Sequence, residues 1–180
     1  RVGGEFFRSP VVVEARVLLE AVLDPGDDAA LLELAETRWY PGLATSPCPA
    51  FLSPEEKTSW NEGVAPLIPW RARFSSLRHD DHFDRADLTK LRRRVLALGR
   101  HLQNLPVLAW LIECRRVFRP ELVAFADPTD RVERSRYSRG FDQLITRLDE
   151  EFRDSPLSPH RLLDYLRQKI ATDTSVDESS

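Results

Sequence analysis

The stretch from residue 10 to residue 34 constrains the fold most, because it predicts two helices joined by a sharp corner. Ser9-Pro10 is a typical helix start, with serine as the N-cap and proline in the first turn. Apolar residues then recur at helical spacing. Asp24-Pro25-Gly26 predicts a turn, since proline and glycine suit a turn better than a helix interior. Asp27-Asp28 predicts the cap of a second, leucine-rich helix, so the chain begins as an α-helical protein.

Length and composition indicate a globular chain with one core. It has 180 residues, of which 42% are apolar and 31% charged, as in ordinary globular domains. No run approaches the roughly 20 apolar residues that a membrane-spanning helix needs, and no secretory signal pattern stands at the beginning. We therefore expect a cytoplasmic protein with no membrane partner. The chain begins with Arg1 and contains no Met, which indicates a piece of a larger protein.

Charge is distributed unevenly along the chain. The net charge is −3, but residues 63–119 carry 12 basic and 5 acidic side chains, whereas the segments before and after them are acidic. A basic middle third leaves room for a local surface that contacts phosphates. The acidic total argues against a protein that coats nucleic acid along its whole surface.

The organisation we predict is one helical domain over residues 1–180. Residues 1–40 form a helical lead-in, 41–85 a proline-rich irregular insertion, 86–170 a helical core and 171–180 a frayed polar tail. Within the insertion, Ser53 and Glu56 around Pro54 form a capping box that predicts one short helix. Trp39 and Tyr40, just before the insertion, are expected to be core or interface aromatics.

The helical core begins with the clearest helix in the chain. Its apolar residues alternate at spacings of three and four, which gives one stripe: Leu88, Leu91, Val95, Leu98 and Leu102. Arg92, Arg93 and Arg94 lie off this stripe, mainly on its solvent-facing flanks. They form either a solvated helix face or a phosphate-binding face.

Three further helices follow. One is opened by Pro106, one spans residues 131–152, and one is capped by Ser158. The fold class predicted from these patterns is mainly α, with little or no sheet.

The opening of the chain resembles a known family. The order Gly3-Gly4, then Phe6-Phe7-Arg8, an apolar helix, and a segment containing Pro25 and Asp27-Asp28 resembles the superfamily 1 DNA helicases of the UvrD/PcrA/Rep type. The resemblance rests on about thirty residues. In that family this segment leaves the second RecA-like domain and leads into a helical inserted subdomain called 2B. The resemblance therefore implies a 2B-like accessory domain.

The resemblance also implies a role and DNA-contacting residues. Thr37 to Leu43 stands where the family has a glycine-containing segment that touches duplex phosphates, although here the second glycine is absent. Candidate DNA-binding residues are Arg38 and Gly42 from this segment, with Arg92, Arg93 and Arg94 from the basic helix. The parent would be an ATP-dependent 3′-to-5′ helicase of DNA repair or replication. Its implied partners are a single-strand/duplex junction, the helicase motor domains and repair proteins.

Catalytic motifs are missing from the sequence. No G-x-x-x-x-G-K-[ST] loop is present to hold nucleotide phosphates. ATP and Mg²⁺ are therefore expected to belong to the parent helicase, and this fragment is expected to hold no cofactor and no catalytic residue. Cys48 and Cys114 lie far apart and are expected to be reduced thiols.

Two other interpretations stay open. One is a helical protein-interaction module that does not bind DNA, which the acidic segments and the net charge favour. The other is a metal-dependent hydrolase built on His79-Asp80-Asp81-His82, whose side chains are suitable ligands for zinc or manganese. We predict no metal site, because no third or fourth ligand cluster is evident elsewhere and because Asp84 or Asp87 is expected to cap the following helix.

Overall fold

A computed structural model describes residues 6–62, 85–123 and 127–178, and these contain helices but no strand. The predicted mainly α fold class is therefore confirmed. The described side chains share one hydrophobic core, to which helices from the beginning, middle and end of the chain contribute.

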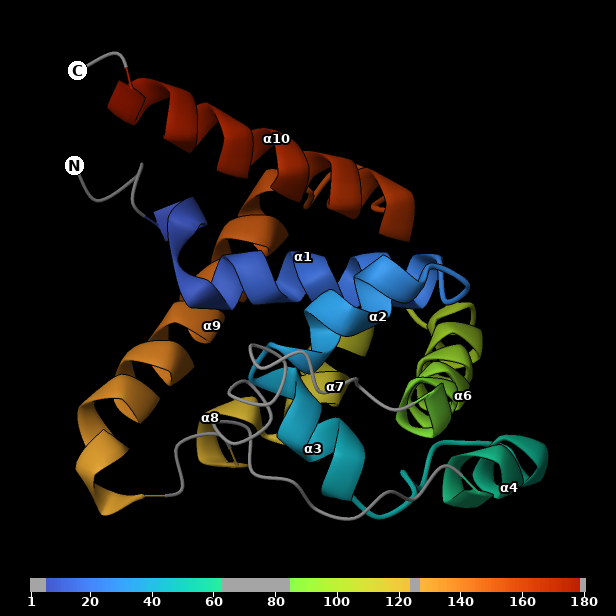
Figure 1. The fold of residues 1–180 in the computed structure, drawn as a ribbon. Coiled ribbons are helices and arrows are strands. Elements are labelled where there is room, and N and C mark those ends of the chain that lie inside the picture. The colour runs from blue at the N-terminus through green and yellow to red at the C-terminus, as the bar shows by residue number, and fades with distance from the viewer. Residues whose placement is uncertain (1–5, 63–84, 124–126, 179–180) are drawn as a thin grey trace.

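Figure 1 shows the helices in the order in which they follow one another, with residues 63–84 between α4 and α6. In chain order they are η1 (Phe6–Arg8), α1 (Pro10–Leu23), α2 (Asp28–Ala35), α3 (Trp39–Thr45), α4 (Pro54–Glu62), α6 (Arg85–Leu102), α7 (Val107–Phe118), α8 (Pro120–Val123), η2 (Pro128–Asp130), α9 (Arg131–Glu151) and α10 (Pro159–Glu178).

Helix α1 is the centre of the fold. It packs against α2, α6, α9, α10 and η1, and Figure 1 shows it running across the middle of the molecule with α10 along one side. Because neighbours lie on several sides, α1 buries more than one stripe: Val11, Val12, Ala15, Val17, Leu18, Leu19, Ala21 and Val22 are all nearly inaccessible. A helix that is apolar around most of its circumference is typical of such a central position.

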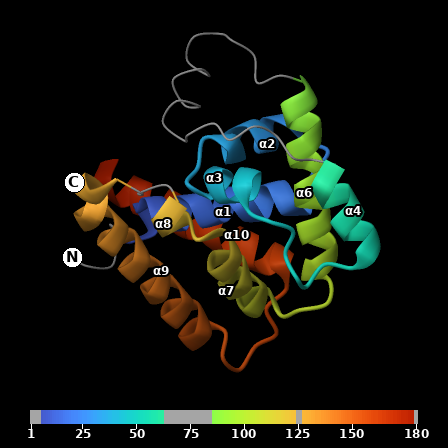
Figure 2. The same cartoon turned by 90° about the horizontal axis from the view of Figure 1, so that it is seen from below.

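Two edges flank this centre. Helices α4 and α6 pack on each other at one edge, and α9 lies at the opposite edge (Figure 2). Helix α9 contacts α1, α7 and α8. The first and last described elements, η1 and α10, also pack together.

Several local predictions from the sequence are confirmed. Pro10 begins α1, and the Asp27 side chain accepts a hydrogen bond from the amide of Ala29 at the start of α2. The capping box before α4 is complete, since the Ser53 amide donates to Glu56 and the Glu56 amide donates to Ser53 Oγ. Ser158 caps α10 through the amide of Arg161.

The insertion differs from the prediction in its first part. Residues 41–45 were expected to be irregular as the first part of the 41–85 insertion, but they belong to α3 (Trp39–Thr45). Pro41 is tolerated because it lies in the first turn, where a missing amide costs no hydrogen bond. Residues 63–84 lie outside the described residues, and the His79-Asp80-Asp81-His82 cluster falls there with Asp84.

The end of the chain also differs from the prediction. Helix α10 continues through Glu178, whereas residues 171–180 were expected to be a frayed tail. Among the described residues, no helix has both the length and the apolar character needed to cross a membrane.

Candidate nucleic-acid interface

Arg38 is fixed by a carboxylate from the central helix. Its guanidinium Nη1 donates to Glu14 Oε2 at 2.7 Å, and its backbone amide donates to Glu14 Oε1 at 2.6 Å. Burial raises the pKa of the Glu14 carboxyl above its ordinary value, although the charge and hydrogen bonds of Arg38 act in the opposite direction. The guanidinium also lies 5.7 Å from the ring centroid of Tyr137 on α9. Arg38 therefore ties α1, α3 and α9 together.

Gly42 has a packing role inside the core. It is buried in α3, and a Cβ at this position would overlap the backbone carbonyl of Phe118 at the end of α7. Its hydrogen side chain is what allows α3 and α7 to approach each other so closely. The structure does not leave the Gly42 backbone open to a phosphate.

The three arginines of the basic helix α6 have different environments. Arg92 Nε donates to the carbonyl of Pro25 at 2.9 Å, and its Nη2 pairs with Asp28, so it fastens α6 to the corner between α1 and α2. Arg93 is exposed. The expectation that all three arginines face the solvent flanks is wrong for Arg94, which is only 3% exposed.

Helix α4 covers Arg94. The guanidinium lies 4.5 Å from the ring centroid of Trp60, and Nη1 donates to the carbonyl of Leu43 at the end of α3. Burial removes the Arg94 guanidinium from water. The Trp60 ring stacks on it and the last turn of α3 accepts its hydrogen bond, and both contacts offset this loss. The five predicted residues are consequently not brought together into one surface.

A different set of arginines does form one surface. Arg131, Arg134 and Arg139 lie in the first half of α9, and we call these three the arginine ridge. Arg134 and Arg139 follow Arg131 by three and eight residues, which places all three on one side of a helix. None of them forms an ion pair or a hydrogen bond with another described residue. Net charge along the sequence does not predict the ridge, because the basic segment is 63–119, which contains α6, whereas residues 120–180 are acidic in total.

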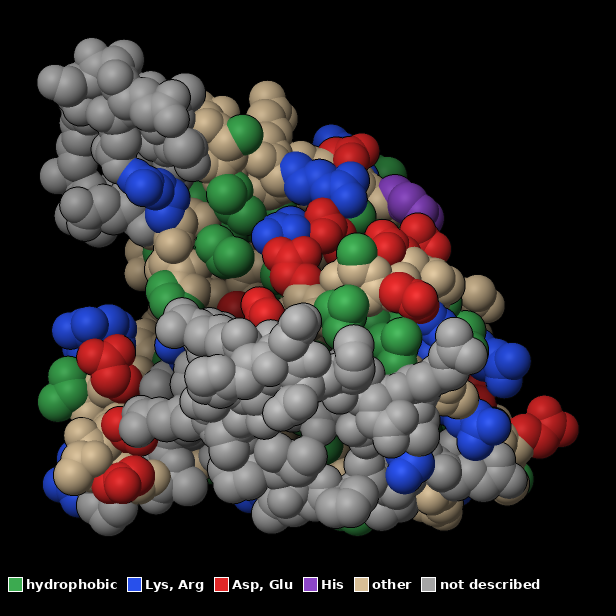
Figure 3. Space-filling model, in the orientation of Figure 1, with side chains coloured by type: hydrophobic (Ala, Val, Ile, Leu, Met, Phe, Trp, Pro, Cys, Tyr) green, Lys and Arg blue, Asp and Glu red, His purple; other side chains and the backbone are tan. Residues whose placement is uncertain are grey.

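A shallow hollow between α8 and α9 lies along the ridge. It has a volume of about 470 Å³. The three arginines line it together with Ser135, Ser138, Leu122 and one carboxylate, Glu121. In Figure 3 this end of α9 is at the lower left, where basic and acidic side chains stand side by side. Arginine and serine are the side chains that most often contact backbone phosphates.

Two carboxylates of α8 and α9 pair with an arginine of α7. Arg115 on α7 forms ion pairs with Glu121 at 3.3 Å and with Asp142 at 2.5 Å, and it donates to Ser138 Oγ at 2.8 Å. Its guanidinium also lies 4.7 Å from the ring centroid of Phe141. Arg115 therefore has a structural role, and it partly neutralises Glu121, the one carboxylate that lines the hollow with the ridge arginines.

Comparisons of the chain with protein-family models, with curated proteins and with solved structures find no match. The interpretation of the arginine ridge therefore depends on its own geometry. Among the residues that the structure describes, no group of three or more His, Cys, Asp or Glu side chains is arranged to hold a metal ion.

Proposed function

We propose that this chain is a 2B-like accessory region of a UvrD/PcrA/Rep-type DNA helicase, and that the arginine ridge contacts the phosphate backbone of duplex DNA at a single-strand/duplex junction. The observation that carries the DNA contact is the ridge itself: three arginines on one side of α9 that have no carboxylate partner among the described residues. Each can form bidentate hydrogen bonds with a phosphate.

Two features of the fold support the helicase part of the proposal. The described part of the family-like opening, from Phe6 onward, lies in η1, in the central helix and in the corner leading to α2, so this part belongs to the core. The first and last described elements, η1 and α10, pack together, an arrangement that suits a domain inserted into a larger chain. ATP and Mg²⁺ would act in the motor domains of the parent, which this region would regulate.

The test is the salt dependence of DNA binding by the 180-residue chain. A labelled duplex with a single-stranded overhang is titrated at a series of salt concentrations, and the logarithm of the affinity is plotted against the logarithm of the salt concentration. Arg131→Glu with Arg134→Glu should weaken binding and lower the slope by about 2, since each lost phosphate contact removes about one unit.

The matched control is Arg93→Glu with Arg153→Glu. Both residues are exposed and lie outside the hollow, and the change in net charge is the same. The control should keep the slope of the unmodified chain. If both double variants lose the same affinity, the ridge has no special role; if the unmodified chain fails to bind at low salt, the interaction-module interpretation replaces this proposal.

A further inference from the structure

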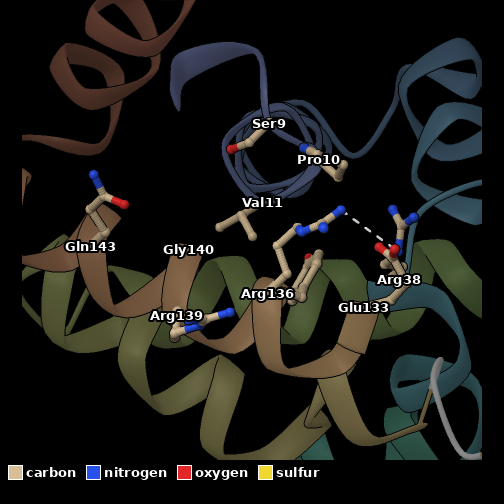
Figure 4. A pocket seen from close by; sticks show the side chains of 10 residues that line it. Ser9, Pro10, Val11, Arg38, Glu133, Arg136, Arg139, Gly140 and Gln143 are labelled. Carbon is tan, nitrogen blue, oxygen red and sulfur yellow. Dashed lines mark hydrogen bonds and ion pairs between the residues drawn. The ribbon is translucent and has the colours of Figure 1, made fainter. Parts of the chain in front are cut away.

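A second depression lies on the other side of α9. It is formed between the first turn of α1 and the side of α9 that carries residues 136, 140 and 143, and it has a volume of about 360 Å³ (Figure 4). We call it the α1–α9 pocket. Arg139 is at the edge shared with the arginine ridge, but the remaining lining residues are different.

The floor of the pocket is apolar. Val11 and Tyr137 form it and are 3% and 4% exposed. Gly140 allows α9 to approach α1 closely, because a Cβ at this position would come within 3.1 Å of Val11 Cγ2. Pro10 is exposed at the edge. This floor can take up an apolar side chain, and a phosphate group would gain nothing from it.

The wall of the pocket carries more positive than negative charge, with Arg38, Arg136 and Arg139 against one carboxylate, Glu133. Arg38 is held in place by Glu14, whereas Arg136 is 69% exposed and pairs only loosely with Glu133, at 3.5 Å. Figure 4 shows the Arg136 side chain reaching from α9 towards the first turn of α1. Arg136 can therefore turn to a ligand at little cost, since an exposed pair at this distance contributes little to stability.

The N-terminus of α1 adds to this positive environment. The Ser9 side chain makes no capping hydrogen bond to α1, and its hydroxyl is buried without a hydrogen-bond partner among the described residues. The first-turn amides and the helix dipole favour a negative group at this end of α1. One firmly paired arginine, one exposed arginine and a helix N-terminus thus surround the apolar floor.

We propose that the α1–α9 pocket docks an acidic linear segment of a partner protein, with one large apolar side chain on the Val11–Tyr137 floor and a flanking carboxylate on Arg136. The size fits this occupant, because ligand pockets for whole small molecules measure about 300–1,000 Å³ and this one is near the lower limit. The proposal does not depend on DNA binding by the ridge.

The test uses a labelled synthetic peptide with one central phenylalanine between aspartates, whose fluorescence anisotropy is measured with the full chain. Arg136→Glu should weaken binding by about tenfold or more, because it replaces a charge-assisted hydrogen bond with repulsion. Exchanging the phenylalanine of the peptide for alanine should cost about tenfold as well, since the apolar contact is lost.

The matched control is Arg134→Glu, two residues earlier on the same helix. This residue lines the α8–α9 hollow and not the pocket, so the variant should bind the peptide like the unmodified chain while its DNA binding is weakened. Circular dichroism should give equal helix content for both variants, because both positions lie on the surface side of α9.

Three results would overturn the inference. Equal binding of the phenylalanine and alanine peptides would show that the floor is not used. Equal losses with Arg136→Glu and Arg134→Glu would show a diffuse charge effect. A loss of DNA binding with Arg136→Glu, without any peptide binding by the unmodified chain, would show that the pocket serves nucleic acid. The first two results do not depend on whether the ridge itself binds DNA.

Discussion

Gly42→Ala separates a packing role for Gly42 from a role in phosphate contact. Gly42 lies inside α3, where alanine is the better helix former by about 1 kcal/mol. Helix propensity alone therefore predicts that the substitution stabilises the protein. Tertiary packing predicts the opposite, because the new Cβ would lie 2.9 Å from both the carbonyl carbon and Cβ of Phe118 and would overlap the carbonyl oxygen.

The magnitude follows from what would have to move. Carbon atoms in contact normally lie about 3.5–4.0 Å apart, so α3 and the end of α7 must separate by more than about half an ångström. Phe118 is fully buried and stacks on Trp60 at 5.8 Å between ring centroids, so its backbone has little freedom. Overpacking of this kind costs about 3 kcal/mol at the upper end of the usual range. Subtracting the gain of about 1 kcal/mol in helix propensity leaves a net destabilisation of about 2 kcal/mol.

The measurement is thermal and urea unfolding followed by circular dichroism. For a domain of this size, about 2 kcal/mol corresponds to a fall in Tm of about 4–8 °C. The control is Gly26→Ala, because the nearest atom to a Cβ there is Asp24 Oδ1 at 3.9 Å and the glycine has no positive φ. That variant should be unchanged or slightly more stable. A Gly42→Ala chain as stable as the unmodified one, with weakened DNA binding, would refute the packing role and restore the phosphate contact.

Two further predictions concern the buried charges. Glu14→Gln should lower the free energy of unfolding by about 1–3 kcal/mol, because the Gln amide has one acceptor oxygen for the two donors of Arg38 and its NH2 group would face the other donor. Burial raises the pKa of Glu14, so the folded chain holds this proton more tightly than the unfolded chain. The stability of the unmodified protein relative to Glu14→Gln should therefore fall as the pH rises above 4.5. Urea unfolding of both chains at several pH values measures this difference, and a relative stability that rises with pH would contradict the prediction. Arg94→Lys should destabilise the protein by about 1–3 kcal/mol, since an ammonium cannot both stack on Trp60 and reach the Leu43 carbonyl as the planar guanidinium does. Arg93→Lys is its control and should change stability by less than about 0.5 kcal/mol, and equal effects of the two substitutions would show that burial of Arg94 is unimportant.

Local sequence signals predicted the ends of many helices. Pro10, the Asp24-Pro25-Gly26 corner, the Ser53–Glu56 capping box and Ser158 act within a few residues of themselves. Their hydrogen bonds and dihedral preferences are present in any fold that contains the helix. The exceptions, α3 and the last two turns of α10, lack such a signal or contain residues that normally interrupt a helix.

The candidate site was much harder to predict. The sequence marks Arg92, Arg93 and Arg94 as equivalent neighbours, yet one is fastened to a corner, one is exposed and one is buried under Trp60. The arginines of α9 lie in a part of the chain, residues 120–180, that is acidic in total. The pairing of Glu121 and Asp142 with Arg115, which comes from α7, has no counterpart in the sequence pattern.

The sequence by itself determined that this chain is helical, where most of its helices begin, and that its first helix is apolar enough to be buried. These properties follow from backbone preferences and from periodicity, which act over a few residues. Tertiary structure alone decided which arginines are available, because availability depends on what packs against each one from distant parts of the chain. Helix α4 buries Arg94, Glu14 pairs with Arg38, and Arg115 on α7 pairs with Asp142 of α9. Charge pairing across long separations has no pattern in a single sequence, so the surface that we propose for DNA became visible only in the folded chain.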